Sequence, residues 1–336
     1  MKKLLLFVLA IGFGFTSFSQ ANKVVFMGAK APEAAVMEMP PQQNSSTIIA
    51  SEVPTTKTEI LNGRATSFVP IGQSGNAYGF YNNSRTYVWA DPNLNSVVFT
   101  HRMTGGVEVE GNSRLAYDLS TDGGTSWTTN AHVYSPLGPG PQYPDAAGRY
   151  PQGGIINPEG NTDPANAHYT YFAATLDGTN GGSWGGYCYG SNPLIETDPT
   201  NPSQVNLTTE GDYIRYVPDA FTVAQNGVAW YYDGSVDWSS GASDYTGNII
   251  LGRGEIVDDE VVYEERLIEF LDPGNSINDY KIAFAPDGQT GYIVASGTND
   301  VGVAAYSYSA PYILKTTDGG EAWSDATLVQ LGGVDG

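Results

Sequence analysis

The residues best suited to chemistry in this sequence are arginines that flank apolar runs. Arg149 lies in residues 148–151, which read G-R-Y-P, and Arg215 lies in residues 214–218, which read I-R-Y-V-P. Arg102 ends another apolar run and is a third candidate. A guanidinium group can hold a carboxylate through two parallel hydrogen bonds. These arginines are therefore candidates for binding an acidic group, although the simpler interpretation is that Arg149 and Arg215 brace neighbouring structural units.

Aromatic residues near glycine-rich segments form a second set of candidates. Tyr150 directly follows Arg149, and Trp184 lies in the run G-G-S-W-G-G, shortly before Tyr187. Aromatic rings stack on sugars or peptide side chains at a low entropic cost. They favour a site that binds a ligand and needs no cofactor.

Motifs for metal, phosphate and nucleophilic chemistry are absent from the sequence. The three histidines, His101, His132 and His168, stand in no metal-binding motif. No glycine-rich phosphate loop and no G-x-S-x-G elbow occurs. Cys188 lies between tyrosines and is predicted to be a small buried apolar group. We therefore predict no metal site.

Two acidic segments are predicted to be ordinary turns. Residues 258–260, with Glu264 and Glu265, have the pattern of a solvated hairpin turn followed by an outer strand. Residues 157–163 alternate oxygen-bearing side chains, which calcium could use, but the EF-hand spacing is missing. A plain turn is the favoured interpretation.

A fourfold internal repeat supplies the elements that would position these residues. Each repeat has a short apolar strand, a turn rich in Pro, Asn and Gly, and a second strand rich in aromatics. The interval between repeats is about 65 residues, longer than common propeller blades, so inserted loops are expected. The first strands carry the marker residues Val88, Ile155, Phe221 and Phe284.

Two matching segments stand in the same phase of the first and fourth repeats. Residues 120–127 read S-T-D-G-G-T-S-W, and residues 316–323 read T-T-D-G-G-E-A-W. The aspartate can accept hydrogen bonds from N–H groups of its own turn, glycine tolerates a positive φ, and tryptophan anchors the next strand by burying its ring. Each segment is therefore predicted to form a hairpin turn. The residues that define the two turns are Ser120, Asp122, Gly124 and Trp127, and Thr316, Asp318, Gly320 and Trp323.

This pattern resembles the Asp-box, or BNR repeat, of sialidase-type and sortilin-type β-propellers, in a secreted bacterial form. The resemblance implies an all-β fold, a β-propeller of four-stranded antiparallel blades, with the boxes on the rim away from the mouth where substrates bind. Sialidases of this family use three arginines, an acid/base Asp and a Tyr–Glu pair. Arg149 and Arg215 match the arginine motif only in part, and the sequence identifies no Asp or Tyr–Glu pair.

The composition agrees with a protein of many short strands. The 336 residues include 41 Gly and 20 Pro, and only 15% of them are charged. The net charge of −21 disfavours nucleic acid and anionic membranes as partners. A single cysteine excludes an intramolecular disulfide.

The chain divides into three predicted regions. Residues 1–19 have the basic start, apolar run and small residues of a secretory signal, so no membrane span is expected after cleavage. Residues 20–66 are predicted to be a disordered leader or linker. Residues 67–336 would hold the four repeats. Since a further repeat would begin beyond the last residue, we expect an incomplete ring, truncated at its C-terminus; a complete four-bladed ring is the alternative.

Two functions follow from these observations. The favoured hypothesis is a secreted or cell-surface propeller that acts as a glycan- or protein-binding or scaffold module. The alternative is a glycoside hydrolase, sialidase-like or of another Asp-box type, which would need two carboxylates across a cleft or a Tyr–Glu pair. Among 36 acidic residues the sequence offers no means of choosing two. The candidate ligand-binding residues are Arg149, Tyr150, Arg215, Arg102 and Trp184.

Overall fold

The structure is a computed structural model, and it describes most of the chain after residue 56. The described residues are 57–61, 64–75, 85–103, 113–137, 146–177, 183–199, 202–218, 220–237, 240, 244–270, 277–298 and 309–329. The predicted signal and most of the predicted leader lie outside them. In the described ranges the regular elements are strands, apart from one short 3-10 helix, η3 (Pro164–Asn166). None of these ranges contains a helix long and apolar enough to cross a membrane.

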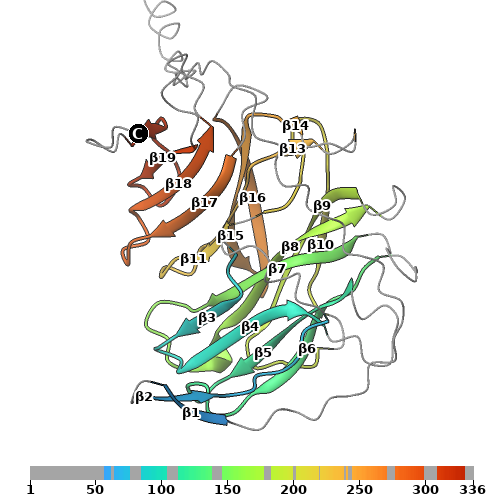
Figure 1. Ribbon diagram of the computed structural model, residues 1–336, viewed down its shortest axis with the longest axis vertical. Coiled ribbons are helices and arrows are strands. Elements are labelled where there is room, and N and C mark those ends of the chain that lie inside the picture. Colours follow the sequence, from blue (N-terminus) through green and yellow to red (C-terminus); the bar gives the residue numbers. More distant parts are fainter. Residues whose placement is uncertain are drawn as a thin grey trace, which may run out of the picture.

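Four antiparallel sheets of four strands each correspond to the four predicted repeats (Figure 1). Blade 1 consists of β3 (Val88–Asp91), β4 (Ser96–Arg102), β5 (Leu115–Ser120) and β6 (Thr128–Tyr134). Blade 2 consists of β7 (Ala147–Ile156), β8 (His168–Asp177), β9 (Ser183–Pro193) and β10 (Val205–Thr208). Blade 3 consists of β11 (Ala220–Val223), β12 (Ala229–Asp233), β15 (Asn248–Val257) and β16 (Glu260–Glu269). Blade 4 consists of β17 (Ile277–Phe284), β18 (Gly291–Thr298), β19 (Ser309–Thr316) and β20 (Thr327–Leu328).

Every predicted repeat hairpin is present in the expected place. Each marker residue lies on the first strand of its blade and pairs with the second strand. The pairs are Val88 with Phe99, Ile155 with Tyr169, Phe221 with Tyr231, and Phe284 with Gly291. The predicted fold class, an all-β propeller of four-stranded antiparallel blades, is therefore confirmed.

Two small hairpins were not predicted. β1 (Lys57–Leu61) pairs with β2 (Arg64–Phe68), so the prediction of a disordered leader up to residue 66 is wrong for its last part. The sequence Asn62-Gly63 between these strands is a strong two-residue hairpin signal, which the leader interpretation overlooked. β13 (Val236–Asp237) and β14 (Asp244–Tyr245) form the second hairpin, in the connection between β12 and β15.

Aromatic rings in close contact join each blade to the next. Tyr117 of blade 1 lies on Tyr169 of blade 2, with ring centroids 3.9 Å apart. Phe172 of blade 2 lies on Tyr231 of blade 3 at 3.8 Å. Tyr232 of blade 3 lies against Tyr280 of blade 4 at 4.1 Å. These rings belong to three apolar cores, one at each junction between neighbouring blades.

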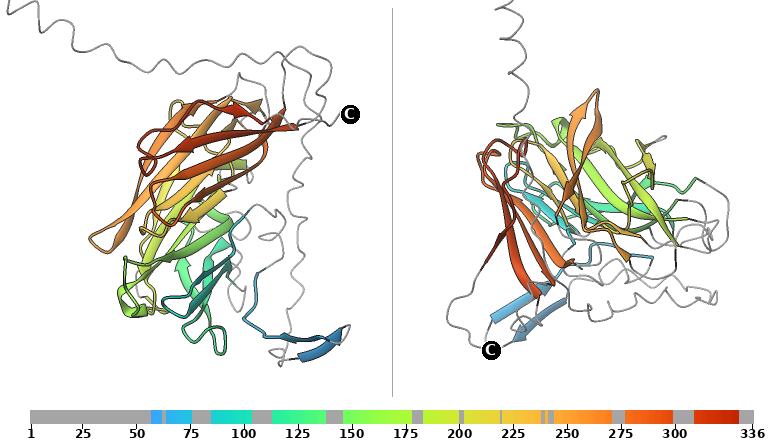
Figure 2. Two further views of the ribbon diagram at one scale, coloured as in Figure 1. Left: turned by 90° about the vertical axis from the view of Figure 1, so that its left-hand side faces the viewer. Right: turned by 90° about the horizontal axis from the view of Figure 1, so that it is seen from above.

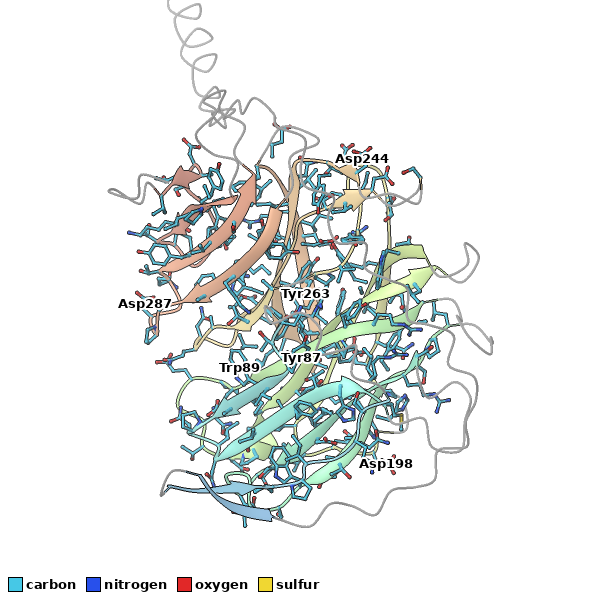
Figure 3. The ribbon with its side chains drawn as sticks, in the orientation of Figure 1. Tyr87, Trp89, Asp198, Asp244, Tyr263 and Asp287 are labelled. Carbon is cyan, nitrogen blue, oxygen red and sulfur yellow. The ribbon has the colours of Figure 1, made fainter. Side chains whose placement is uncertain are left out.

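The first strands of blades 1, 2 and 3 are tied together near the centre. Thr86, just before β3, donates its hydroxyl to the carbonyl of Phe221 on β11 at 2.7 Å. Gln152 on β7 accepts from the backbone N–H of Thr86 at 2.9 Å and donates to the carbonyl of Pro218 at 2.8 Å. Figure 3 shows Tyr87 and Trp89 in this central region.

The blades follow one another along an arc. Figure 2 shows the sheets fanned in the order of the chain. Among the described residues, ring contacts and a hydrogen bond from Asn226 to the carbonyl of Gly288 link blade 4 to blade 3. The arrangement of the described sheets is the open arc that was expected.

The two ends of the blades differ in what they carry. The connections from one blade to the next, and the loops between the second and third strands of each blade, lie at one end, here called the entry end. The turns between first and second strands, and between third and fourth strands, lie at the other end, here called the box end. The turns that carry Asp122 and Asp318 both lie at the box end.

The two box turns have the same pattern of hydrogen bonds, each within its own turn. In the first, Asp122 accepts from the hydroxyl of Ser120 at 2.8 Å and from the N–H of Ser126 at 2.8 Å. In the second, Asp318 accepts from the hydroxyl of Thr316 at 2.7 Å and from the N–H of Ala322 at 3.0 Å. The aspartates therefore accept from N–H groups of their own turns, as predicted, and the hydroxyls of Ser120 and Thr316 are additional partners.

The tryptophans of these turns are buried less than predicted. Trp127 is half-buried and donates its indole N–H to the carbonyl of Gly124 at 3.1 Å, so it covers its own turn. Trp323 is also half-buried and meets the ring of Trp230 on blade 3 edge-on. Only the second box therefore packs its tryptophan against a neighbouring blade.

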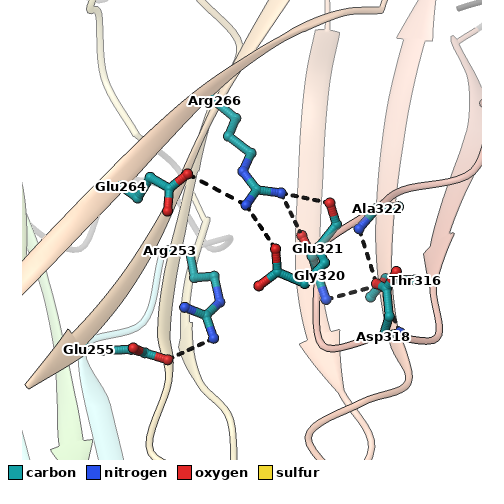
Figure 4. Close-up of polar contacts among 9 residues, drawn as sticks. All are labelled: Arg253, Glu255, Glu264, Arg266, Thr316, Asp318, Gly320, Glu321 and Ala322. Atoms are coloured by element: carbon teal, nitrogen blue, oxygen red, sulfur yellow. Dashed lines mark hydrogen bonds and ion pairs between the residues drawn. The ribbon is translucent and has the colours of Figure 1, made fainter. Parts of the chain in front are cut away.

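An arginine of blade 3 holds the second box from outside (Figure 4). Arg266 on β16 donates to the carbonyls of Glu321 at 2.7 Å and Gly320 at 3.2 Å, and forms an ion pair with the Glu321 carboxylate. Together with Trp323, this contact makes the second box a connector between blades 3 and 4.

Candidate functional site

Three aromatic residues meet at the entry end between blades 2 and 3. Tyr150 near the start of β7 lies against Trp184 at the start of β9, with ring centroids 5.5 Å apart. Trp184 in turn meets Tyr216, in the segment before β11, at 5.9 Å. Val217 and Ala174 are fully buried beneath them. We call Tyr150, Trp184 and Tyr216 the aromatic platform.

Burial decreases across the platform. Tyr150 is only 6% exposed, and the guanidinium of Arg85 lies 4.4 Å from the centre of its ring. Trp184 and Tyr216 are half-buried, so part of each ring is open to solvent. Tyr150 therefore supports the platform from within, and Trp184 and Tyr216 form its solvent-facing part.

The backbone at Tyr150 has an unusual conformation. Its φ is +49°, in the left-handed region that bulky residues rarely adopt, and the β7–β8 register shifts between Arg149 and Gln152. Backbone strain of this kind is concentrated at ligand-binding and catalytic sites. The bulge aims Tyr150 toward Trp184, while the neighbouring Arg149 reaches the other way, toward blade 1.

A buried carboxylate lies beneath the platform. Asp233, at the end of β12, is fully buried and accepts hydrogen bonds from the hydroxyl of Tyr187 and from the backbone N–H of Tyr216, the latter at 2.9 Å. Burial, with the nearby Asp233 charge, raises the pKa of Tyr187 well above its ordinary value, so its hydroxyl stays a donor. Asp233 therefore fixes the segment that carries Tyr216.

Arg215 belongs to a different group of residues, between blades 2 and 3. Its guanidinium forms an ion pair with Glu265 on β16 and donates to the carbonyl of Thr208 on β10. Glu265 also accepts from the hydroxyl of Tyr231. Arg215 is 7% exposed, which agrees with the bracing interpretation. The expectation that Glu265 faces solvent is wrong. Its side chain points inward from the outer strand and pairs with Arg215.

The structure separates the other candidate arginines from the platform. Arg149 is buried and donates to the carbonyl of Gly148 at 2.8 Å and to Ser113 of blade 1 at 3.5 Å. Arg102 is buried at the end of β4, where its carbonyl accepts from the N–H of Gly75 at 3.0 Å. Of the five predicted ligand-binding residues, only Tyr150 and Trp184 are brought together.

Sequence reasoning missed three residues of this region: Arg85, Tyr216 and Asp233. A signal for Tyr216 was present, because Arg215–Tyr216 repeats the Arg149–Tyr150 pair one blade later. No sequence pattern pointed to Arg85 or Asp233, since their roles depend on contacts between distant strands.

The remaining chemistry-bearing residues have structural surroundings. His101 is buried and contacts Asp118 at 3.2 Å, and Cys188 is buried with a raised thiol pKa caused by that burial. In residues 157–163, Asn161 donates to Asn157 at 2.8 Å, as in a plain turn. The described residues contain no group of three side chains suited to a metal ion.

Comparison with known proteins finds likeness in structure only. The sequence matches no protein-family model and no curated protein. An exo-β-1,3-galactanase from Phanerochaete chrysosporium, solved with β-1,3-galactotriose, is 11% identical with a TM-score of 0.40, over 73% of this chain and 50% of that one. A GH43 β-1,3-galactosidase is 13% identical with a TM-score of 0.36, over 72% of this chain and 44% of that one.

A third similar structure is that of an enzyme with a different activity. An N-acetylgalactosamine deacetylase from F. plautii, in complex with blood group B trisaccharide, is 13% identical with a TM-score of 0.34, over 74% of this chain and 71% of that one. The chain spans about half the length of the galactanase. Likenesses this distant do not identify a substrate for this chain.

Proposed function

We propose that this chain is a glycan-acting β-propeller that binds carbohydrate at the aromatic platform. One observation carries the proposal: two half-buried aromatic residues, Trp184 and Tyr216, lie at the entry end, and Trp184 packs on the buried Tyr150. Aromatic faces bury the C–H faces of sugars while the sugar hydroxyls remain free to bond polar groups. The strained backbone at Tyr150 supports a functional rather than a purely packing role.

The test uses the purified protein on an array of immobilised neutral and acidic oligosaccharides. Trp184→Ala is expected to abolish the array signal because it removes the centre of the platform. Trp127→Ala is the matched control: Trp127 is also a half-buried tryptophan, but it lies in the box turn at the opposite end. Equal loss of signal in both variants, or retention in Trp184→Ala, would refute the platform as the binding site.

Hydrolysis of the bound glycan is the second candidate function. The observation that favours it is the buried carboxylate of Asp233, which bonds the backbone of Tyr216 directly beneath the platform. A glycoside hydrolase needs a second carboxyl group near the scissile bond. Asp233→Asn, compared with the unmodified protein in a screen of aryl glycosides, tests this role: turnover lost in the variant supports hydrolysis, and turnover equal in both excludes Asp233.

Family and location are parts of the same proposal. The hydrogen bonds of the Asp122 and Asp318 turns support an Asp-box propeller of the sialidase or sortilin type. The basic and apolar residues of positions 1–19 support a secreted or cell-surface protein. Mass spectrometry of the mature N-terminus tests this: a start near Gln20 is expected, and retention of residues 1–19 in the exported protein would contradict it.

A further inference from the structure

From the geometry of the platform we infer that the site recognises a single sugar ring and does not bind the extended face of a polysaccharide. This inference rests on the proposed carbohydrate function and specifies its ligand. A flat stacking surface for a long sugar chain needs several rings in one plane, so that each successive sugar has a ring face to stack on. The platform does not have that form, for two independent reasons.

The first reason is the angle between the two accessible rings. The planes of Trp184 and Tyr216 are inclined by 78°, with centroids 5.9 Å apart. Rings so inclined form the two walls of a corner. A sugar stacked on one wall has the other wall nearly perpendicular to it, so the corner offers no flat surface to a second sugar.

The second reason is the burial of the third ring. Tyr150 continues the aromatic series behind Trp184, inclined to it by only 36°. It is 6% exposed, with the Arg85 guanidinium 4.4 Å from its centre. The one ring that could extend the stacking surface is therefore occupied by the protein itself.

The corner is also held in place by its surroundings. Asp233 bonds the backbone N–H of Tyr216, and Val217 beside it is buried. Tyr150 supports Trp184 from within. Both walls are held in place before a ligand arrives, so little side-chain entropy is lost on binding. One sugar ring can therefore supply all of the free energy that stacking contributes.

The experiment measures affinity against chain length. Neutral β-linked oligosaccharides of glucose, xylose and galactose, from the monosaccharide to the hexasaccharide, are titrated into the purified protein by calorimetry. In the series that binds, we expect the dissociation constant to change less than about threefold beyond the disaccharide. An increase in affinity of more than about tenfold between disaccharide and hexasaccharide would overturn the inference while leaving carbohydrate binding intact.

Two variants connect the result to the corner. Tyr216→Phe keeps the wall and is expected to retain affinity, whereas Tyr216→Ala removes it and is expected to lose binding of the shortest ligands first. Near-UV circular dichroism checks that both variants keep the packed aromatic core. Equal affinities in the Ala and Phe variants would also overturn the inference. Failure of every series and of the glycan array would instead refute the proposed function, and this inference with it.

Discussion

The carboxyl group of Asp233 accepts a hydrogen bond from the backbone N–H of Tyr216 at 2.9 Å, so a buried side chain of blade 3 positions one of the two half-buried rings of the platform. The same carboxylate accepts the hydroxyl of Tyr187 on blade 2. Blades 2 and 3 are thereby joined at the point where the platform lies. The candidate site and the packing of the propeller depend on the same residue.

Removing this carboxylate is predicted to destabilise the fold. Asp233→Ala leaves the Tyr187 hydroxyl and the Tyr216 N–H without their buried acceptor, at a cost of about 1–3 kcal/mol for each. Asp244→Ala is the control, since that carboxylate is exposed and its loss should change stability by less than about 0.5 kcal/mol. Urea unfolding followed by tryptophan fluorescence measures both. Equal midpoints for the two variants would show that the Asp233 contacts do not hold the blades.

The ion pair of Arg215 and Glu265 is predicted to brace blades 2 and 3. Glu265→Gln should cost about 3–5 kcal/mol, because it leaves the buried guanidinium without its charged partner. Glu255→Gln is the control: its partner Arg253 and its own carboxylate are more exposed, so the loss should be about 0–1 kcal/mol.

The double variant Arg215→Met with Glu265→Leu separates charge from packing. It should recover much of the stability lost in Glu265→Gln, since no unpaired buried charge remains. Denaturant titrations give the free energy of unfolding of each variant and so separate the two contributions. A Glu265→Gln variant as stable as Glu255→Gln would contradict the bracing role.

The two box glycines are predicted to differ although their backbones match. Gly124 and Gly320 have φ of +89° and +88°, so alanine is equally strained in both. At Gly320 the added Cβ would lie 2.1 Å from the ring of Trp230, whereas at Gly124 its nearest neighbour is Trp127 at 3.8 Å. Gly320→Ala should therefore lower the melting temperature clearly more than Gly124→Ala. Equal shifts would show that the second box does not dock on blade 3.

The first box is predicted to lose its stabilising effect in acid. Hydrogen bonds from the Ser126 hydroxyl, the Ser126 N–H and the Ser120 hydroxyl lower the pKa of Asp122 to about 2. Since the folded pKa lies below the ordinary value of 3.8, the stabilisation is complete above that value and is lost as the pH falls toward 2. Carbon NMR titration of the Asp122 carboxyl measures the pKa directly. Asp122→Asn should be less stable than the unmodified protein at neutral pH and approach it in acid; a parallel pH dependence would contradict this.

The four blades could be predicted from the sequence because each hairpin is marked by residues close together in the chain. Val88, Ile155, Phe221 and Phe284 recur at one interval, and each begins a hairpin whose turn chemistry is visible in the sequence. The box turns were predictable for the same reason, since Asp122 bonds only to residues within its own turn.

The site was predictable only in part because its contacts join distant residues. Tyr150 and Trp184 were named as candidates from residue type alone. Tyr216 joins them because of the bulge in β7 and because its backbone N–H donates a hydrogen bond to Asp233, 17 residues away. Glu265 was misplaced because Glu264 and the acidic turn 258–260 before it are exposed, while its partner Arg215 lies 50 residues away.

The central claim, that the platform binds carbohydrate, is tested most directly by NMR of the six tryptophan indoles. The indole N–H signals are assigned by single Trp→Phe variants, and the oligosaccharide with the strongest array signal is titrated in. The account predicts that the Trp184 signal shifts in a saturable manner and that the Trp127 signal, at the box end, stays constant. Saturable shifts at Trp127 with none at Trp184 would contradict it.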